Sequence, residues 1–465
     1  MNRKSPLRRR TPTRAHAAES ILPTPAEFHR IAERILKLSD ADETEVTIDA
    51  VADATTRFAN NFIHQNMAEQ SLAISVRTVF DGRTARASTN KSDDEALRRV
   101  VAASSEMSRQ QPKDPELLPM PGKQTYAKVS RYFEETAGAS PDSRARVVKG
   151  VLAPIIKHQQ TAAGIFSTGA FASALANSKG LFAAHRQTRA EFSITVMDKD
   201  SSGWAKANAP DVRAINPRDS GESASWRALS TRAPRELPPA RYTVILEPAA
   251  VLDLLGFLFY DFAATAVQDQ RSCLNGRMGK QLFGKNITLC DDVTHPLQTG
   301  VPFDGEGLPR QKVLLVDRGV PRNLVYSRSA AKRAKSKPTG HGMALPNEWG
   351  EAPMNLVWSG GDTSLQDMIA STEFGVLVTR LWYIREVDPY DKIMTGMTRD
   401  GTFAIDRGRI SGGIRNFRFN QSIIELLNNV EALGPAVRAA GEESFEMVVP
   451  AMKVRNFHFT EVTKF

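Results

Sequence analysis

Histidine pairs would be the most direct sign of metal-dependent hydrolysis. Two histidines one helical turn apart, with a glutamate beside them, can hold zinc and activate a water molecule. The sequence has eight histidines, and the two closest in the chain, His16 and His29, are 13 positions apart. No pair therefore has the spacing of a helical zinc motif, and the sequence predicts no metal site built on paired histidines.

One short segment does combine residue types that bind metals. Cys290, Asp291, Asp292 and His295 lie within six consecutive positions. Their spacing matches no standard ligand set, and an Asp-Asp pair ahead of Thr-His-Pro is also ordinary turn chemistry. We therefore expect no metal in this chain. A cryptic metal enzyme that uses Cys290, Asp292 and His295 is the least favoured hypothesis.

Other catalytic motifs are missing from the sequence. The segment 276–280, GRMGK, has neither the spacing nor the trailing hydroxyl residue of a phosphate-binding loop. No Gly-x-Ser-x-Gly sequence is present to position a serine nucleophile. Cys273 and Cys290 could act as nucleophiles, but buried thiols are the commoner explanation for isolated cysteines. The residues alone therefore indicate no enzyme class.

Length and composition indicate a folded protein with a sizeable core. The chain has 465 residues, of which 41% are hydrophobic and 24% charged, so it is too apolar to be disordered throughout. No stretch approaches the roughly 18 uninterrupted apolar residues of a transmembrane helix, so we expect no membrane association. With only two cysteines, a disulfide framework is excluded and a reducing, cytoplasmic location is expected.

The net charge of +9 raises the question of nucleic-acid binding. Much of the excess lies in the first 20 residues and in a cluster between Arg328 and Lys337. Neither stretch has interleaved aromatic residues or a recognition motif. We therefore expect a basic disordered tail over residues 1–24, a solvated loop around 328–337, and no nucleic-acid partner.

Periodicity, caps and turns predict an α+β fold, with two smaller helix-plus-antiparallel-sheet units followed by a large β-rich C-terminal domain. The capping box at 24–27 begins a helix, and the Asp81-Gly82 turn joins two strands of a hairpin. Proline-rich stretches separate the units. We expect an N-terminal α+β unit at 25–110, a central α+β unit at 122–233 and the C-terminal domain at 238–465. In the last, one helix over about 249–268 should follow a strand at 242–247.

Seven short motifs then follow one another in order over about 400 residues. They are TRFANN at 56–61, ANS at 176–178, VILEP at 244–248, GRMGK at 276–280, ITLCDD at 287–292, FDGEG at 303–307 and KPTGHG at 337–342. Each motif is weak alone, but in this order they resemble the TldD/PmbA family, also called TldD/TldE. The resemblance runs from about Ala26 to the C-terminus.

Members of that family are intracellular peptidases built from two related subunits. The TldD-type subunit carries a His-Glu-x-x-x-His zinc motif on a helix and a cysteine near its C-terminus, and the TldE/PmbA-type subunit lacks these ligands. The matching positions here are Leu255, Gly256 and Tyr260, and the segment 442–452 has no cysteine. The resemblance therefore implies a TldE/PmbA-type subunit without its own cofactor, with zinc expected in a TldD-type partner.

The resemblance implies a subunit of a TldD/TldE-type zinc metallopeptidase complex, acting in proteolysis of flexible or modified peptides. The alternative is a homodimeric peptide-binding protein of the same fold without peptidase activity. Catalytic residues are not expected in this chain. Candidate contacts to substrate, or to the chamber that holds it, are Asp304, Gly305, Glu306, Gly307, Thr339, Gly340 and His341. For residues 304–307 a tight structural turn is at least as favoured, and for His341 a solvent-facing loop position.

Overall fold

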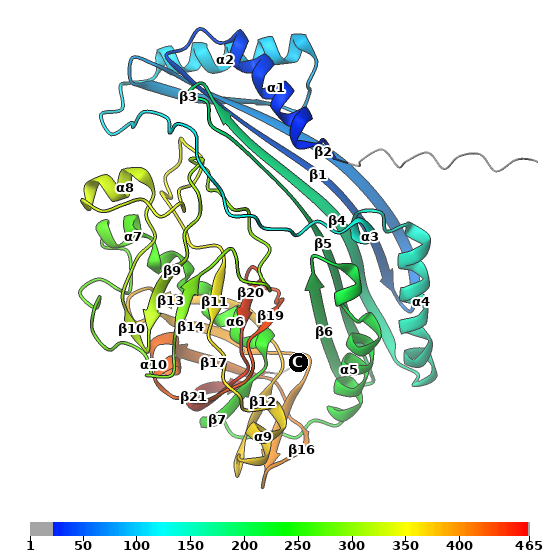
Figure 1. Ribbon diagram of the computed structural model, residues 1–465. Helices are drawn as coiled ribbons and strands as arrows, with labels where there is room; N and C mark the ends of the chain where they lie inside the picture. Colours follow the sequence, from blue (N-terminus) through cyan, green and yellow to red (C-terminus); the bar gives the residue numbers. More distant parts are fainter. Residues whose placement is uncertain (1–21, 464–465) are drawn as a thin grey trace, which may run out of the picture.

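The computed structural model describes residues 22–463, so the expected tail at 1–24 lies almost wholly outside the described residues. A long curved sheet with helices at both ends lies against a C-terminal domain made largely of strands (Figure 1). This arrangement confirms the expected α+β fold with a large β-rich C-terminal domain. The domain boundaries expected at 110, 122, 233 and 238 stay a prediction.

One six-stranded antiparallel sheet contains the strands of both smaller units. Its order is β3-β2-β1-β4-β5-β6, and the pairing of β1 with β4 joins the part before residue 110 to the part after residue 122. The two smaller units therefore share a single sheet. The strands are β1 (Glu43–Ala59), β2 (Phe62–Phe80), β3 (Arg83–Thr89), β4 (Thr161–Asn177), β5 (Phe182–Met197) and β6 (Ser202–Ala209).

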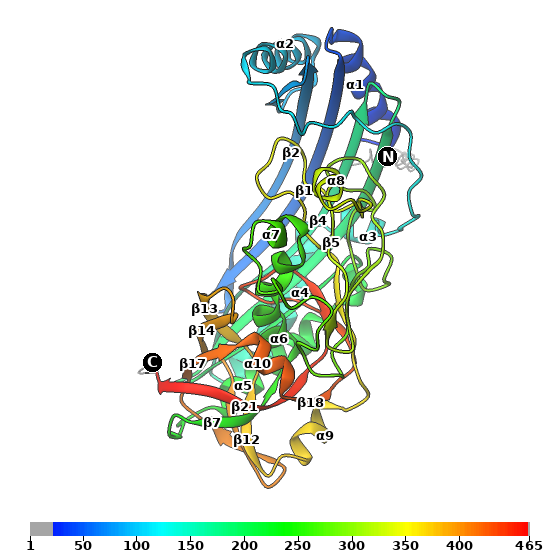
Figure 2. The same cartoon turned by 90° about the vertical axis from the view of Figure 1, so that its left-hand side faces the viewer.

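Two groups of helices cover one face of this sheet. Alternate residues of a strand point to the same face, and the even-numbered residues of β1 and β4 pack under both groups. Figures 1 and 2 place one group at one end of the long strands and the other group toward the opposite end. The odd-numbered face is left for the C-terminal domain. The helices are α1 (Pro25–Leu38) and α2 (Asp94–Gln110) at one end, and α3 (Glu134–Ala137), α4 (Pro141–Lys157), the 3-10 turn η1 (Val212–Ala214) and α5 (Pro217–Ser230) toward the other.

The start of α1 is the one that the sequence predicts. Thr24 is the N-cap, its hydroxyl accepts the Glu27 N–H, and the Glu27 carboxylate accepts the Thr24 N–H at 2.7 Å. Phe28, Ala32 and Ile35 then face the sheet at helical spacing and are buried.

The C-terminal domain contains two further sheets around the largest core of the molecule. The smaller has the order β10-β9-β8-β11-β20-β19, and the larger has β13-β14-β17-β21-β7-β12-β15-β16, with β18 paired to β21. Strands of the smaller sheet are β8 (Leu289–Asp291), β9 (Val313–Asp317), β10 (Val320–Pro321), β11 (Leu356–Trp358), β19 (Val437–Ala439) and β20 (Met447–Val449). Those of the larger are β7 (Arg241–Leu246), β12 (Phe374–Val378), β13 (Leu381–Asp388), β14 (Ile393–Thr398), β15 (Thr402–Asp406), β16 (Arg409–Gly413), β17 (Phe417–Ser422), β18 (Val430–Leu433) and β21 (Met452–Val462).

The helix expected over 249–268 is three short pieces instead. They are α6 (Pro248–Leu255), the 3-10 turn η2 (Gly256–Phe262) and α7 (Ala264–Gln268). The break has a tertiary cause. Ala263 is extended and bridges Val325, and the Ala264 N–H donates to the Val325 carbonyl at 3.0 Å. These bonds to a segment distant in the chain replace helical bonds, so the continuous-helix prediction is wrong.

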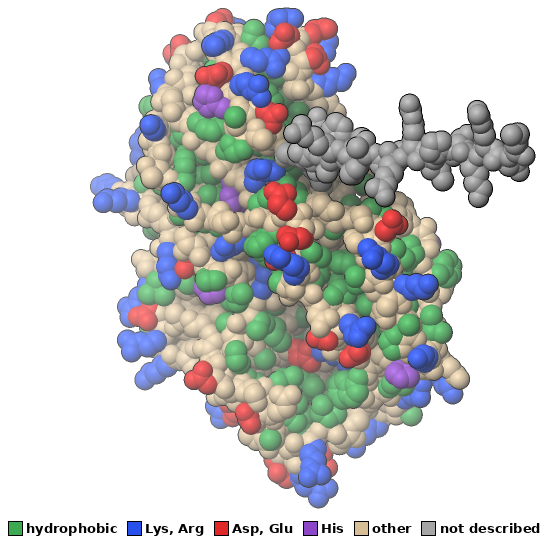
Figure 3. Space-filling model, turned by 45° about the vertical axis from the view of Figure 1, so that its right-hand side comes forward, with side chains coloured by type: hydrophobic (Ala, Val, Ile, Leu, Met, Phe, Trp, Pro, Cys, Tyr) green, Lys and Arg blue, Asp and Glu red, His purple; other side chains and the backbone are tan. Residues whose placement is uncertain are grey.

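The basic cluster at 328–337 is only partly a loop. Residues 328–333 form the short helix α8 (Arg328–Arg333), capped by the Ser327 hydroxyl, which accepts the Ala330 N–H. On the face seen in Figure 3, lysine and arginine side chains are dispersed among acidic and apolar ones.

The remaining C-terminal helices are α9 (Leu365–Ala370) and α10 (Ile423–Asn428). Within residues 22–463, no helix has both the length and the apolarity to cross a membrane.

Candidate functional site

The turn at 303–309 is organised by the buried carboxylate of Asp304. Its Oδ1 atom accepts the backbone N–H groups of Glu306 at 3.0 Å and Leu308 at 2.8 Å. Its Oδ2 atom accepts the Gly342 N–H at 2.8 Å, and the Gly305 N–H donates to the Gly342 carbonyl. Burial raises the pKa of Asp304 despite these three donors. The carboxylate thus joins the FDGEG turn to Gly342, the last residue of the KPTGHG motif.

Close packing explains why Gly340 is a glycine. Its φ of +71° is rarely adopted by other residues, and a Cβ atom there would lie 2.1 Å from the Pro309 carbonyl oxygen. The Gly307 carbonyl on the same turn accepts the Tyr126 hydroxyl at 2.9 Å, which ties the turn to the linker beside the six-stranded sheet. The predicted residues 304–307 and 339–341 are therefore neighbours in space.

His341 forms a buried pair with Asp291. The Nε2 atom of His341 lies 3.0 Å from Oδ1 of Asp291, and both side chains are 0% exposed. The other ring nitrogen is 3.0 Å from the Thr339 hydroxyl, which also accepts the Tyr326 N–H. Burial opposes ionisation, yet His341 and Arg310 hold the pKa of Asp291 below its ordinary value. The imidazole and the carboxylate are enclosed, so a solvent-facing His341 is not observed.

Glu306, one of the predicted residues, lines a cavity. It lines a hollow of about 480 Å³ between the C-terminal domain, β3 and the linker at 114–118. Its Oε2 atom accepts the Arg328 N–H at 2.8 Å. Burial, followed by the charge of Asp304, raises the pKa of Glu306 to about 7. Glu306 therefore changes charge near neutral pH, at the boundary between the two parts of the molecule.

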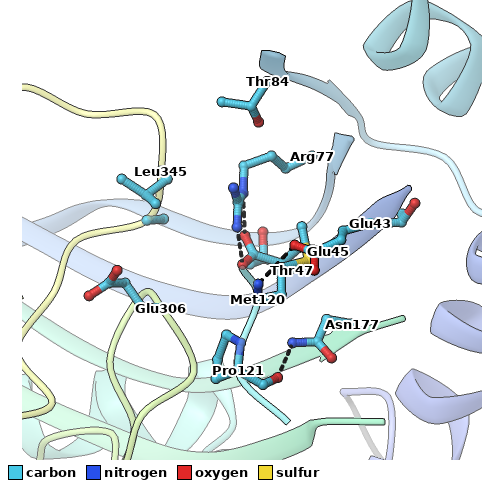
Figure 4. Close-up of polar contacts among 12 residues, drawn as sticks. Glu43, Glu45, Thr47, Arg77, Thr84, Met120, Pro121, Asn177, Glu306 and Leu345 are labelled. Atoms are coloured by element: carbon cyan, nitrogen blue, oxygen red, sulfur yellow. Dashed lines mark hydrogen bonds and ion pairs between the residues drawn. The ribbon is translucent and has the colours of Figure 1, made fainter. Parts of the chain in front are cut away.

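A charged row on the six-stranded sheet faces the same boundary. Glu45 on β1 is the register partner of Arg77 on β2, which is the partner of Arg86 on β3. Arg77 donates to Glu45 Oε2 at 2.9 Å, Arg86 donates to Oε1, and Arg86 Nε donates to the Leu345 carbonyl at 2.7 Å. Figure 4 shows Glu45 and Arg77 facing each other, with Glu306 and Leu345 on the C-terminal side. Burial alone would raise the pKa of Glu45, but the two guanidinium groups hold it below its ordinary value.

The sequence gives only an indirect sign of this row. Arg77 and Arg86 lie on either side of the predicted Asp81-Gly82 turn, but their alignment with Glu45 depends on the register of three strands. The preference of arginine for carboxylates could have suggested the pairing only once that register was known.

A second cavity lies where the family resemblance places the zinc motif. It has a volume of about 540 Å³ and is lined by Gly256, Tyr260 and their aromatic neighbours Phe257, Phe259 and Phe445. Its charged lining includes Asp261, Glu386 and Lys392. The Lys392 ammonium lies 2.6 Å from Asp261 Oδ2 and 2.8 Å from Glu386 Oε1. An internal cation therefore already bridges the two carboxylates and offsets one of their two charges.

Beneath this cavity, Asp253 on α6 holds the loop that carries Phe445. Its buried carboxylate accepts the N–H groups of Glu442 at 3.1 Å and Glu443 at 3.0 Å. Burial raises the pKa of Asp253 to about 7. Asp253 is thus a structural carboxylate between α6 and the 441–445 segment, and it accepts backbone donors rather than facing the cavity.

The residues of this second cavity do not fit a zinc ion. Leu255 is apolar, Gly256 has no side chain, and the Tyr260 hydroxyl donates to the Trp349 carbonyl at 2.8 Å. The carboxylates of Asp261 and Glu386 bind Lys392. Zinc sites are built from several His, Cys or carboxylate ligands, and none of the described residues forms a group of three or more such side chains placed to hold a metal.

The Cys290–His295 segment does not converge on one point either. Asp291 pairs with His341, whereas Asp292 accepts the Thr294 N–H and binds Lys312 at 3.0 Å. Burial raises the pKa of the Cys290 thiol to about 11, so it is not a thiolate at neutral pH. The turn chemistry expected from the sequence is present, and the metal hypothesis gains no support among residues 22–463.

Comparisons with known proteins cover nearly the whole described chain. Three family models match, described as PmbA/TldA metallopeptidase domain 1 at residues 45–108, the central domain at 120–232 and the C-terminal domain at 239–461. An uncharacterized protein of Methanocaldococcus jannaschii is 26% identical over 328 residues, which are 66% of this chain and 73% of that protein. A metalloprotease of Methanothermobacter thermautotrophicus is 23% identical over 290 residues, 57% of this chain and 60% of that one.

The same fold occurs in a solved structure. The crystal structure of TldE from Thermococcus kodakarensis has a TM-score of 0.85 and 19% sequence identity, and the match covers 92% of this chain and 100% of that one. At this identity the likeness concerns the fold.

Proposed function

This chain belongs to the PmbA/TldD metallopeptidase family, and from that premise we propose that it is the subunit that does not bind metal in a TldD/TldE-type peptidase complex. The zinc of such a complex belongs to a TldD-type partner. The substrates are flexible or modified peptides. The proposed location is the cytoplasm, in keeping with the two free cysteines.

The observation that carries the proposal is the ammonium of Lys392 between Asp261 and Glu386. A lysine that bridges two carboxylates offsets one of their two negative charges, and its ammonium occupies the place where a divalent cation would bind them. Much of the remaining lining is aromatic, from Phe257, Phe259, Tyr260 and Phe445. These features support a pocket that contacts peptide or partner rather than one that activates water.

The edge of the nine-stranded sheet supports a role in binding. β13 is the terminal strand of that sheet, and its residue Glu386 also lines the second cavity. Tyr383 and Val387 on β13 are 55% and 57% exposed. Exposed strand edges with apolar side chains pair readily with an extended peptide or another chain. The cavity and the adjacent edge together would form one wall of a peptide chamber.

Reconstitution of the complex tests the proposal. The chain, the TldD-type homologue from the same host, and the two co-expressed should be assayed against one unstructured peptide. Cleavage only by the co-expressed pair, which should co-purify, is the expected result. Cleavage by this chain alone, or full activity of the homologue with no binding to this chain, would contradict the subunit role.

A further inference from the structure

The cavity that contains Glu306 combines apolar walls with an excess of acid. Leu117, Leu118, Leu345 and Pro346 provide the apolar part. Five acidic residues line it, against Arg333 as the basic residue: Asp114, Glu116, Asp269, Glu306 and Glu348. Its volume of about 480 Å³ is within the ordinary range for ligand pockets. A long side chain with an aliphatic stem and a positive end matches both kinds of lining.

Two of these acids are already paired with an arginine within the protein. Arg333 binds Glu116 at 2.8 Å, and Arg271 binds Asp269 at 2.7 Å. Asp114 accepts the Glu116 N–H at 2.9 Å. Glu348 forms no ion pair with any residue of the described range 22–463. Asp114 has no ion-pair partner within that range either, so the uncompensated negative charge belongs to Asp114, Glu348 and Glu306.

Glu306 is the deepest of these carboxylates, since the residue is only 6% exposed. Oε2 accepts the Arg328 N–H, whereas Oε1 accepts no hydrogen bond from any residue that the structure describes. The charges of Asp304 and Glu45 add to the negative potential around it, and Arg328 opposes them. Oε1 is therefore free to accept a hydrogen bond from a ligand in the cavity.

We propose that this cavity binds the side chain of a lysine or arginine in a peptide. The cation donates to Glu306 Oε1, and its aliphatic stem lies along Leu117 and Leu345. Charge-assisted hydrogen bonds of this kind are short and strong, and a guanidinium or ammonium group has only donors to offer. The inference rests on the proposed function in one respect, that the ligand is a peptide, and it adds a preference for a basic residue.

A pair of matched peptides tests this preference. Each is a fluorescent, unstructured Gly/Ser-rich peptide with one arginine, or with citrulline, its uncharged isostere, at the same position. Binding to the full-length chain alone is measured by fluorescence anisotropy at pH 8. The arginine peptide should bind about 10- to 100-fold more tightly, as expected for a charge-assisted hydrogen bond. Equal affinities would overturn the proposal.

Substitution of single carboxylates, and a change of pH, identify the carboxylate that binds the cation. In Glu306→Gln the arginine preference should fall to near unity, whereas in Glu33→Gln, a change on α1 far from this lining, it should persist. Glu348→Gln should weaken the arginine preference partially. This variant replaces Glu306→Gln in the test if Glu306→Gln does not fold. Because the pKa of Glu306 is about 7, affinity for the arginine peptide should drop about tenfold from pH 8 to pH 6. The charges that face Glu306 are Asp304, Glu45 and Arg328, with Arg333 and the cavity acids.

Two further results would count against the inference. Free cadaverine that binds as tightly as the peptide would assign the cavity to small amines, and an unchanged preference in Glu306→Gln would assign it to another carboxylate. This assay uses the chain without a partner and without cleavage. Failure of the arginine preference therefore leaves the subunit role untouched, and failure of complex formation leaves the binding result standing.

Discussion

The ammonium of Lys392 lies 2.6 Å from the carboxylate of Asp261, and their side chains are only 7% and 3% exposed. Lys392 follows β13, and Asp261 belongs to η2, so the pair joins the edge of the larger sheet to the segment that matches the family's zinc motif. Glu386 supplies a second carboxylate at 2.8 Å. A protein cation thus occupies the acidic part of the cavity.

The first prediction concerns this pair. Lys392→Met should lower the free energy of unfolding by about 3–5 kcal/mol, because it leaves Asp261 buried without its cation. Asp261→Asn in the same chain should restore much of the loss. Urea denaturation of the wild type, both single variants and the double variant measures the coupling. Additive effects of the two changes would contradict a direct pairing.

The second prediction concerns the pH dependence of stability through Asp253. Its pKa is about 7 when folded, because of burial, against an ordinary 3.8 when unfolded. The folded state therefore binds the proton of Asp253 more tightly than the unfolded state does. The stability that this protonation contributes is present at low pH and disappears as pH rises through 7. Asp253→Asn keeps an oxygen for the Glu442 and Glu443 donors but removes the titration. Between pH 5 and pH 8, the wild type should lose about 2–3 kcal/mol relative to the variant. If the free energy of unfolding changed with pH in parallel for the wild type and Asp253→Asn, Asp253 would not titrate in this way.

The third prediction separates a buried from an exposed ion pair. Glu45→Gln leaves Arg77 and Arg86 facing each other without a carboxylate, so it should cost about 3–5 kcal/mol. Glu95→Gln removes the partner of Arg99 in an exposed helical pair, 72% and 64% exposed, and should change stability little. Chemical denaturation of both variants makes the comparison. A small effect of Glu45→Gln would mean that the row does not hold the sheet against the Leu345 segment.

The fourth prediction uses two glycines with similar backbones. Gly180 has φ +81° and no atom within 4 Å of the position of a Cβ atom, whereas at Gly340 that position lies 2.1 Å from the Pro309 carbonyl. Gly180→Ala should cost about 1 kcal/mol for its φ alone. Gly340→Ala adds a backbone clash and should cost clearly more, as a larger drop in Tm. Equal Tm values for the two variants would argue against tight packing of the KPTGHG loop on the 303–309 turn.

Local signals predict much of the fold, and long-range pairing explains the rest. The capping box at Thr24 and the Asp81-Gly82 turn depend on neighbours in the chain, so they are readable from the sequence. The pairing of β1 with β4 joins residues more than 100 positions apart, and no local pattern shows that two units share one sheet. The break at Ala263 depends in the same way on Val325.

In the candidate site, too, some features can be read from local sequence and others depend on long-range contacts. The FDGEG and KPTGHG motifs identify segments that do meet in space, through Asp304 and Gly342. The sequence cannot tell that His341 is enclosed while Glu306 reaches a cavity, because both depend on residues distant in the chain, such as Asp291 beside His341 and Thr84 in the cavity of Glu306. Lys392 was not a candidate, since it lies 131 positions from Asp261 and in no motif.

The zinc content of each subunit tests the central claim most directly. The chain purified alone, the TldD-type homologue alone and their co-purified complex should be analysed by mass spectrometry of the metal after dialysis against a weak chelator. The subunit account predicts substoichiometric zinc in this chain and about one zinc per TldD-type subunit in the complex. One tightly held zinc per chain in the protein purified alone, lost on Asp261→Asn, would contradict it.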